Sequence, residues 1–228
     1  MRYELKDKPD FSVVHVAFDQ AGEALVVESS SMVARDPGIQ MQTSMSGGLG
    51  SALKRKLLGG ESLFQNTFTA TAPGQTIWLA PAPEGDLEVL ELNGQMPIFL
   101  NSGAFLAAGS GVKLDTQWGG AKGFFSGTGF FLLRADGQGP LFFSAYGGIH
   151  AIDVGPGGYI CDTGSIVGFT GGLQYQVQKV GGLKSLFFSG EGLVCRFSGQ
   201  GRLWVSTRSP ASLAAFLHPF RRVERSND

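Results

Sequence analysis

The histidines of this chain are the first residues to test for metal or acid–base chemistry. They are His15, His150 and His218. A metal site of the cupin kind needs two or three histidines and a carboxylate facing one cavity. No H-x-H pair places two of them on one strand face. We therefore expect structural or surface histidines, no metal site and no cofactor.

The cysteines, Cys161 and Cys195, offer little more chemistry. Cys195 alternates with Leu193 and Phe197, as a small hydrophobic residue on the buried face of a strand does. A nucleophilic cysteine would need an oriented base, and the sequence contains no C-x-x-C pair. We expect both thiols to be buried, and we assign no catalytic residue.

Glycine-rich motifs suggest phosphate binding, but their context does not support it. The sequence has no G-x-x-x-x-G-K-[ST] motif, and the G-x-G motifs at 127–129 and 190–192 open strands. A dinucleotide site requires a helix after its glycines. Turn formation is the better explanation of these glycines.

The densest basic cluster is Lys54, Arg55 and Lys56. Multiplied around a ring of subunits, it could bind an anionic polymer, with an affinity that falls steeply as salt rises. Aromatic and basic residues do not interleave in a stacking pattern, and the net charge is -1. Nucleic acid is therefore a possible partner that we do not favour, and these three residues are its candidates.

The composition indicates which elements position these residues. Of 228 residues, 35 are glycine and 18 are phenylalanine. Glycine costs a helix interior about 1 kcal/mol relative to alanine, whereas turns that need positive φ accept it. Short strands joined by tight turns are expected. No apolar run approaches the roughly 20 residues of a membrane helix, and the first residues do not form a secretory signal. We expect a soluble, cytoplasmic protein.

An internal repeat organises the chain. The segment GTGFFLLRADGQGPLFFS (127–144) aligns with GEGLVCRFSGQGRLWVS (190–206), and a diverged third copy covers 60–80. The predicted division is 1–92, 93–150 and 151–208 for the three repeats, with a C-terminal helix and tail at 209–228. Corresponding aromatic residues, Trp78, Phe142 and Trp204, are expected in the core or at interfaces between modules.

Alternation of apolar and polar residues predicts strands at three related places. The apolar sets are Ile39, Met41, Thr43 and Met45, then Val112, Leu114, Thr116 and Trp118, then Tyr175 and Val177. Ser209 followed by Pro210, with Leu213, Phe216 and Leu217, predicts a short amphipathic helix.

The G-x-G and G-Q-G frame, the run LFFSGEGLVCRFSGQGRLWVSTRSP (186–210) and the segment DTGSIVGFT (162–170) resemble the DUF124 family of uncharacterised bacterial proteins. Its mitochondrial relatives are the altered-inheritance-of-mitochondria proteins, and the resemblance covers nearly the whole chain. It implies three tandem modules like that of the tryptophan RNA-binding attenuation protein, a β-sandwich or short double-stranded β-helix. It also implies a homotrimer, and it transfers no site residue.

These observations predict an all-β protein of three modules that works without catalysis. Small antiparallel modules leave unpaired strand edges, which a head-to-tail trimeric ring would join. The other solution is an open monomer whose end strands are covered by the N-terminal segment and the C-terminal helix.

We predict a ring-forming binding or scaffold protein with an unknown protein or small-molecule partner. The alternatives are an RNA-binding ring, and a small-molecule-binding protein or metal-dependent enzyme on a cupin-like scaffold. In the attenuation protein a groove between modules holds tryptophan, so a similar groove stays open here.

Overall fold

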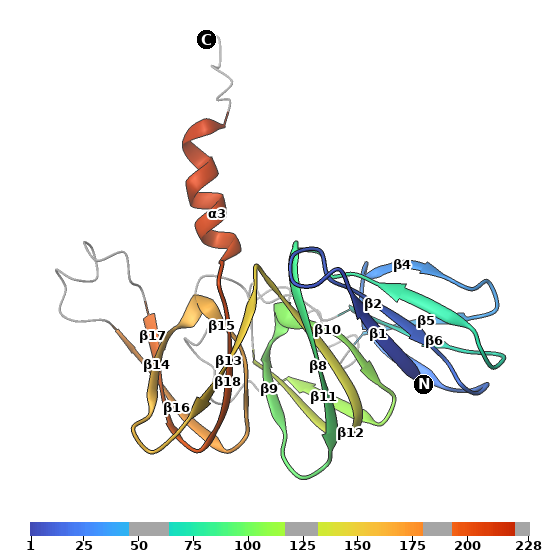
Figure 1. Ribbon diagram of the computed structural model, residues 1–228, viewed down its shortest axis with the longest axis horizontal. Helices are drawn as coiled ribbons and strands as arrows, with labels where there is room; N and C mark the ends of the chain where they lie inside the picture. The colour runs from blue at the N-terminus through green and yellow to red at the C-terminus, as the bar shows by residue number, and fades with distance from the viewer. Residues whose placement is uncertain (46–63, 117–131, 180–192, 222–228) are drawn as a thin grey trace.

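Strands make up most of the chain in its computed structural model, and one short helix stands at the C-terminal end (Figure 1). The structure describes residues 1–45, 64–116, 132–179 and 193–221. The predicted all-β class with a short C-terminal helix is confirmed.

The strands of the N-terminal part form one small sheet and one end of a large sheet. They are β1 (Arg2–Lys6), β2 (Val13–Ala17), β3 (Ala24–Glu28), β4 (Met32–Arg35), β5 (Gln40–Met45), β6 (Phe64–Thr69) and β7 (Thr76–Leu79). The small sheet has the order β1-β2-β7-β4, and β3-β6-β5 ends the large one.

The strands of the rest of the chain complete the large sheet and add a third. They are β8 (Gly85–Asn93), β9 (Ile98–Asn101), β10 (Phe105–Gly109), β11 (Val112–Thr116), β12 (Leu132–Tyr146), β13 (Ile149–Val154), β14 (Tyr159–Asp162), β15 (Ile166–Thr170), β16 (Leu173–Lys179), β17 (Leu193–Gly199) and β18 (Gly201–Ser206). The strand order of the large sheet is β13-β18-β15-β9-β12-β10-β3-β6-β5, and β8 and β11 also pair with β12. The third sheet has the order β14-β17-β16.

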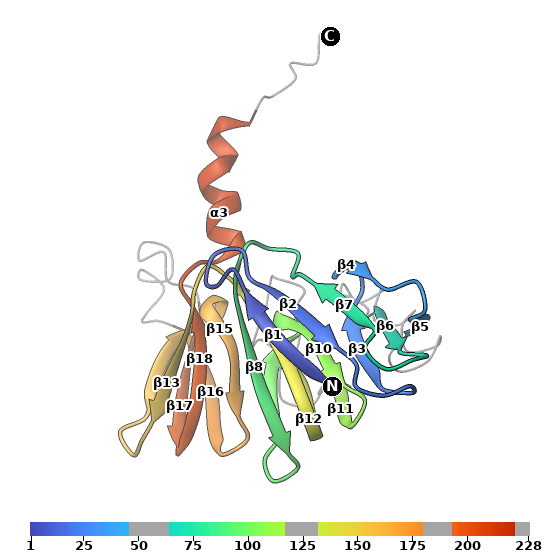
Figure 2. The same ribbon diagram turned by 45° about the vertical axis from the view of Figure 1, so that its right-hand side comes forward.

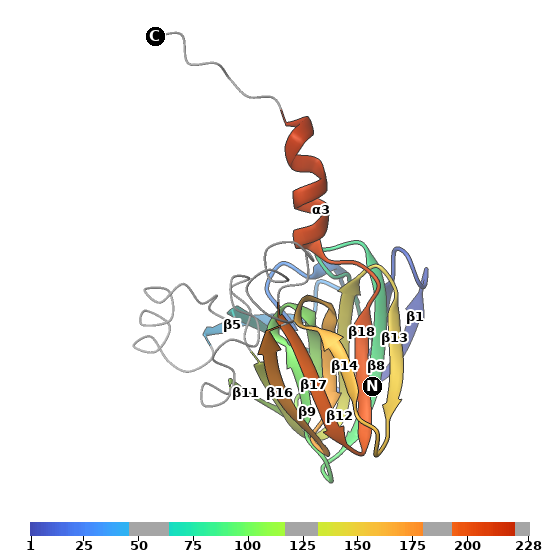
Figure 3. The ribbon, with the colours of Figure 1, turned by 90° about the vertical axis from the view of Figure 1, so that its left-hand side faces the viewer.

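The helical elements are short. They are the 3₁₀ helices η1 (Ser102–Ala104), η2 (Thr163–Ser165) and η3 (His218–Phe220) and the α-helix α3 (Pro210–Leu217). Ser209 caps α3 by accepting a hydrogen bond from the backbone N–H of Ser212, and Pro210 takes the first turn, as predicted. The apolar residues of the predicted amphipathic helix are not buried. The helix extends away from the sheets (Figure 2 and Figure 3), and Leu213, Phe216 and Leu217 are exposed.

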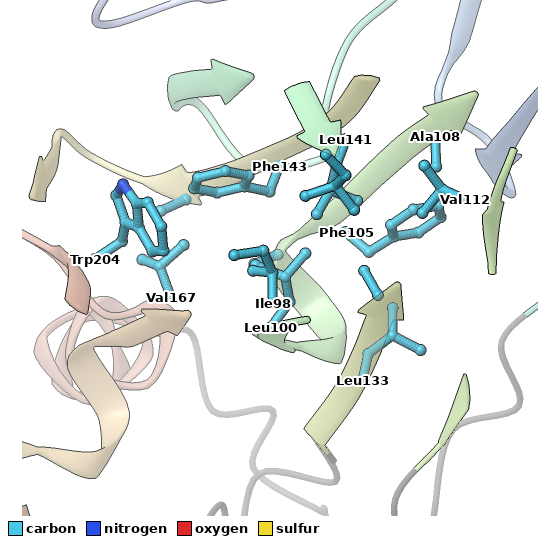
Figure 4. Close-up of a cluster of buried hydrophobic side chains, with 14 residues drawn as sticks. Ile98, Leu100, Phe105, Ala108, Val112, Leu133, Leu141, Phe143, Val167 and Trp204 are labelled. Carbon is cyan, nitrogen blue, oxygen red and sulfur yellow. The ribbon is translucent and has the colours of Figure 1, made fainter. Parts of the chain in front are cut away.

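Buried side chains gather in three clusters along the molecule. One surrounds Phe18, Phe68 and Phe142, a second surrounds Phe105, Phe143 and Trp204, and a third surrounds Phe169 and Phe197. In the second cluster Trp204 lies beside Val167 at one side, with Phe143 next to it (Figure 4). Phe142 and Trp204 therefore face clusters that neighbouring parts of the chain share.

Three strand pairings share one irregularity. The register shifts within the pairs β4·β7, β10·β12 and β15·β18, between the first and third residue of β4, β10 and β15. After the shift, Ala34 is opposite Trp78, Ala107 is opposite Phe142, and Gly168 is opposite Trp204. The three aromatic residues therefore hold corresponding places in their sheets.

The strand at Met41 differs from the sequence prediction. The pattern predicts that Met41 is buried, yet 51% of its surface is exposed. The reason is position: β5 ends the large sheet and pairs within the described residues with β6 alone. Alternation predicts a strand correctly here, but it cannot say whether another layer covers one of its faces.

Strands β2, β8 and β13 begin side by side and then diverge (Figure 1 and Figure 2). Parallel bridges join Gly85 to Phe11 on one side and to Gly147 on the other. The backbone N–H of Asp86 donates to the carbonyl of Gly147 at 2.8 Å, and that of Ser12 donates to the carbonyl of Gly85 at 3.1 Å. A β-carbon at Gly85, where φ is +152°, would lie 2.6 Å from the Gly147 nitrogen, so this junction requires glycine.

Replacing that glycine is expected to weaken the whole fold. Gly85→Ala should lower the free energy of unfolding by at least about 2 kcal/mol, and Tm by about 4–8 °C for a chain of this size, because backbone on both sides must move. Thermal unfolding followed by circular dichroism measures the change. The matched control is Gly157→Ala, where a β-carbon meets no atom within 4 Å. Equal Tm values for the two variants would contradict the required close approach.

Candidate functional site

A cavity of about 600 Å³ opens where β8 and β13 diverge. Strand β8 forms one wall. The ends of β13 and β15 form the other wall, together with β18, which pairs with both of these strands. We call this cavity the β8–β13 groove. It exists because the three strands that start together at Gly85 separate along their length.

The floor of the groove is apolar and rigid. Leu92, Ile98 and Trp204 line it and belong to the second buried cluster. The indole of Trp204 packs edge to face on Phe143, with ring centroids 5.6 Å apart. These contacts fix the ring before any ligand arrives, which reduces the entropy lost on binding. Met96, 46% exposed, adds a flexible apolar side chain at the mouth.

An ion pair forms one rim of the groove. The guanidinium of Arg202 donates to both oxygens of the Asp153 carboxylate, at 2.8 and 3.3 Å. This contact lowers the pKa of Asp153 below its usual value, so the pair is ionised at neutral pH. The backbone N–H of Arg202 donates to Thr170 Oγ1 at 3.0 Å, which fixes the strand that carries the guanidinium. Both side chains are exposed, so the pair adds little to the stability of the fold.

The groove therefore combines an aromatic floor with a fixed pair of charges. Such a combination is typical of binding sites, in which apolar walls supply affinity and a few polar groups fix orientation. The described residues that line it include no histidine or cysteine.

The histidines lie on separate elements. His15 on β2 packs against Trp78, with ring centroids 4.4 Å apart. His150 is exposed on β13, and His218 is exposed in η3 after the C-terminal helix. Within the described ranges, no group of three or more histidine, cysteine, aspartate or glutamate residues is placed to hold a metal ion.

The cysteines lie opposite each other. Cys161 on β14 is the direct partner of Cys195 on β17. Both are buried and both are free thiols, as the sequence predicts. Burial raises the pKa of each thiol to about 12. Their environment is that of structural core residues, in the cluster around Phe169 and Phe197.

The basic residues that the sequence analysis proposed for nucleic-acid binding, Lys54, Arg55 and Lys56, lie outside the described residues. Their role stays a prediction. Among the residues that the structure does describe, no helix is long and apolar enough to cross a bilayer.

A groove between modules stays open from the sequence, but no sequence pattern identifies its lining residues or its ion pair. Trp204 is predicted as a core or interface residue, and the structure places it both in a buried cluster and in the lining of the groove. Arg202 and Asp153 carry no local signal, because they meet through the pairing of β13 with β18. A prediction of that strand pair, with its register, would have placed them together.

The fold and the groove together define an all-β protein with a cavity between diverging strands. A family model described as "Mitochondrial biogenesis AIM24" matches residues 3–208, so the chain belongs to the AIM24 family. The predicted resemblance to DUF124-type proteins with mitochondrial relatives is confirmed.

Two relatives from Streptococcus pyogenes agree with this placement. An uncharacterised protein of serotype M6 is 27% identical over 225 residues, covering 95% of this chain and 90% of that protein. The crystal structure of a protein from the same species has a TM-score of 0.80 at 25% identity, covering 96% of this chain and 99% of the other. The family is one of uncharacterised proteins.

The buried thiols lead to a test of the third cluster. With a pKa of about 12, each thiol is ionised at pH 8 to a fraction on the order of 10⁻⁴. We expect a chromogenic disulfide reagent to label the native protein roughly 10³-fold more slowly than the denatured chain. The native rate should keep rising with pH beyond 9, where an ordinary thiol levels off. Rapid labelling of either cysteine in the native protein would contradict its burial.

Proposed function

We propose that this protein is a non-enzymatic scaffold whose copies close into a ring. In each contact, the free edge of β4 in one copy pairs with the free edge of β14 in the next. The resemblance described above implies three copies. The β8–β13 groove would then be presented around the ring as a binding site.

Two strand pairs inside the chain supply the pattern for this contact. Strand β10 pairs antiparallel with β3, and β15 pairs antiparallel with β9. Strands β4, β10 and β15 correspond through their shared register shift. Strands β3, β9 and β14 correspond because they pair in the same way, with β6, β12 and β17. The corresponding pair still to be made is therefore β4 with β14.

The two strands that would pair have unpaired edges. Within the described part of the chain, β4 pairs with β7 alone and β14 with β17 alone. Each edge also exposes apolar side chains: Val33 is 62% exposed on β4, and Ile160 is 60% exposed on β14. Unpaired edges with apolar side chains are templates for association. Different patches on one chain give a head-to-tail contact, which closes into a ring when the rotation fits.

The internal pairs also fix the register of the proposed contact. Ala107 and Gly168 are the first residues after the register shift, and they pair with Val27 and Leu100. The corresponding residue of β4 is Ala34. Leu100 comes directly before Asn101, which caps η1, as Cys161 comes directly before Asp162, which caps η2. We therefore expect Ala34 opposite Cys161, and Arg35 opposite Ile160.

One observation carries the proposal. The same edge-to-edge pairing occurs twice within the chain, and the two strands that would make it a third time, β4 and β14, belong to the first and the last part of the chain. At the most exposed apolar positions of these strands, Val33 on β4 and Ile160 on β14, neither edge has the charge or proline that usually prevents association.

Native mass spectrometry tests ring formation. Three copies of the 24.1-kDa chain weigh about 72 kDa. Ile160→Lys places a second cation opposite Arg35 in the β4–β14 contact and should release monomers, because like charges directly opposite each other on paired strands repel. Met41→Lys, the same charge at a similarly exposed apolar residue on β5, should leave the assembly intact. A monomeric wild-type protein at micromolar concentration, or an Ile160→Lys variant that assembles normally, would refute the proposed contact.

A further inference from the structure

The space where β2 and β8 diverge is filled by the N-terminal strand of the chain itself. Strand β1 adds to the outer edge of β2, with Tyr3 opposite Val16. The ring of Tyr3 packs edge to face on Phe142, with centroids 5.1 Å apart. Its hydroxyl donates to Glu91 Oε1 at 2.6 Å. An aromatic residue on an added strand thus closes this space against β8 and β12.

The β8–β13 groove is the corresponding space one step further along the molecule. Trp204 holds the place of Phe142, because both follow the same register shift. Asp153 holds the place of Glu91. Asp153 pairs with Arg202, two residues before Trp204, and Glu91 pairs with Pro140, two residues before Phe142. By the same counting, Leu90 on β8 holds the place of Val16 on β2. Leu90, Asp153 and Trp204 all line the groove.

The outer edge of β8 is available for another strand. Among the described strands, β8 pairs with β12 alone, apart from the bridges at Gly85 where it begins. An edge of this kind carries backbone N–H and C=O groups that can pair with an extended peptide. The cavity beside it, of about 600 Å³, lies in the usual range for sites that bury a ligand side chain.

We propose that the β8–β13 groove binds an extended segment of another polypeptide, which adds a strand to β8 as β1 adds to β2 and packs an aromatic side chain against Trp204. The main-chain pairing supplies affinity, and the aromatic floor selects the side chain. The Asp153 carboxylate, although paired with Arg202, has further lone pairs with which to accept a hydroxyl or N–H from that side chain.

The groove also indicates which part of a partner chain it takes. In the filled space, the ammonium group of Met1 lies 2.8 Å from Glu23 and 3.1 Å from Asp19. The corresponding residues at the β8–β13 groove are Met96 and Asn93, which carry no charge. A free N-terminus would lose both ion pairs here. We therefore expect the bound segment to be internal to its chain. This inference rests on the correspondence of strand pairings and does not require the ring to close.

A peptide copied from β1 is the probe. The N-acetylated, C-terminally labelled hexapeptide MRYELK, the sequence of residues 1–6, is titrated with the full chain and followed by fluorescence anisotropy. The first space is already filled by the tethered β1, whose effective concentration excludes the free peptide. We expect saturable binding that weakens at least about ten-fold when alanine replaces the tyrosine of the peptide.

Two matched variants locate the site. Gly155 lines the groove and Gly157 does not, and a β-carbon at either meets no atom within 4 Å. Gly155→Phe should fill the mouth and weaken binding at least about ten-fold, whereas Gly157→Phe should bind as the wild-type protein does. Hydrogen exchange should slow at the β8 amides on binding. The Ile160→Lys variant should bind the peptide as well as the wild-type protein does, which separates this inference from the proposed ring.

Four results would overturn the inference. The first three are the absence of saturable peptide binding, equal affinity in the Gly155→Phe and Gly157→Phe variants, and unchanged hydrogen exchange at β8. Binding of N-acetyl-tyrosinamide as tight as that of the hexapeptide would also overturn it, because the groove would then be a small-molecule site.

Discussion

Backbone hydrogen bonding at strand edges is the constraint on which this structure depends. A strand that ends a sheet leaves a row of N–H and C=O groups to be paired, covered or solvated. The chain pairs two such edges internally, β3 with β10 and β9 with β15, and these pairs join its parts into one large sheet. The edge of β2 is covered by β1. Among the described strands, β4, β14 and β8 each keep one unpaired edge, although the equivalent edges elsewhere in the chain are paired. These three edges are therefore the places where another strand is expected to add.

The junction at Gly85 turns this constraint into a shape. Three strands approach closely there. The approach requires a glycine at position 85, because a β-carbon would collide with the neighbouring backbone. Sheets twist, so strands that touch at one end must separate toward the other. The separation leaves a wedge of space on each side of β8. One wedge is occupied by Tyr3, and the other is the β8–β13 groove.

Local patterns predict the elements well and their relations poorly. Alternation finds the strand from Val112 to Thr116, and Ser209 with Pro210 finds the start of the helix, because the relevant forces act within a few residues. Burial of Met41 depends on a second layer that the sequence does not specify. The groove is harder still: Tyr3 contacts Glu91, 88 positions away, and Arg202 meets Asp153 through the register of two strands. Such contacts follow from strand order, which composition and periodicity leave open.

The two wedges differ in how a strand would be held in register. At β2 the register is held by charge, because Asp19 and Glu23 fix the ammonium of Met1 and the chain cannot slip without breaking both contacts. The strand is also tethered to β2 by a short connection, so little entropy is lost when it docks. Beside β8 these charges are absent, and the larger indole of Trp204 replaces the phenyl ring of Phe142. Register there must come from the fit of one side chain, and a one-residue slip would turn that side chain away from the groove. In the β8–β13 groove, selection of a bound segment therefore depends on how well one of its side chains fits against Trp204.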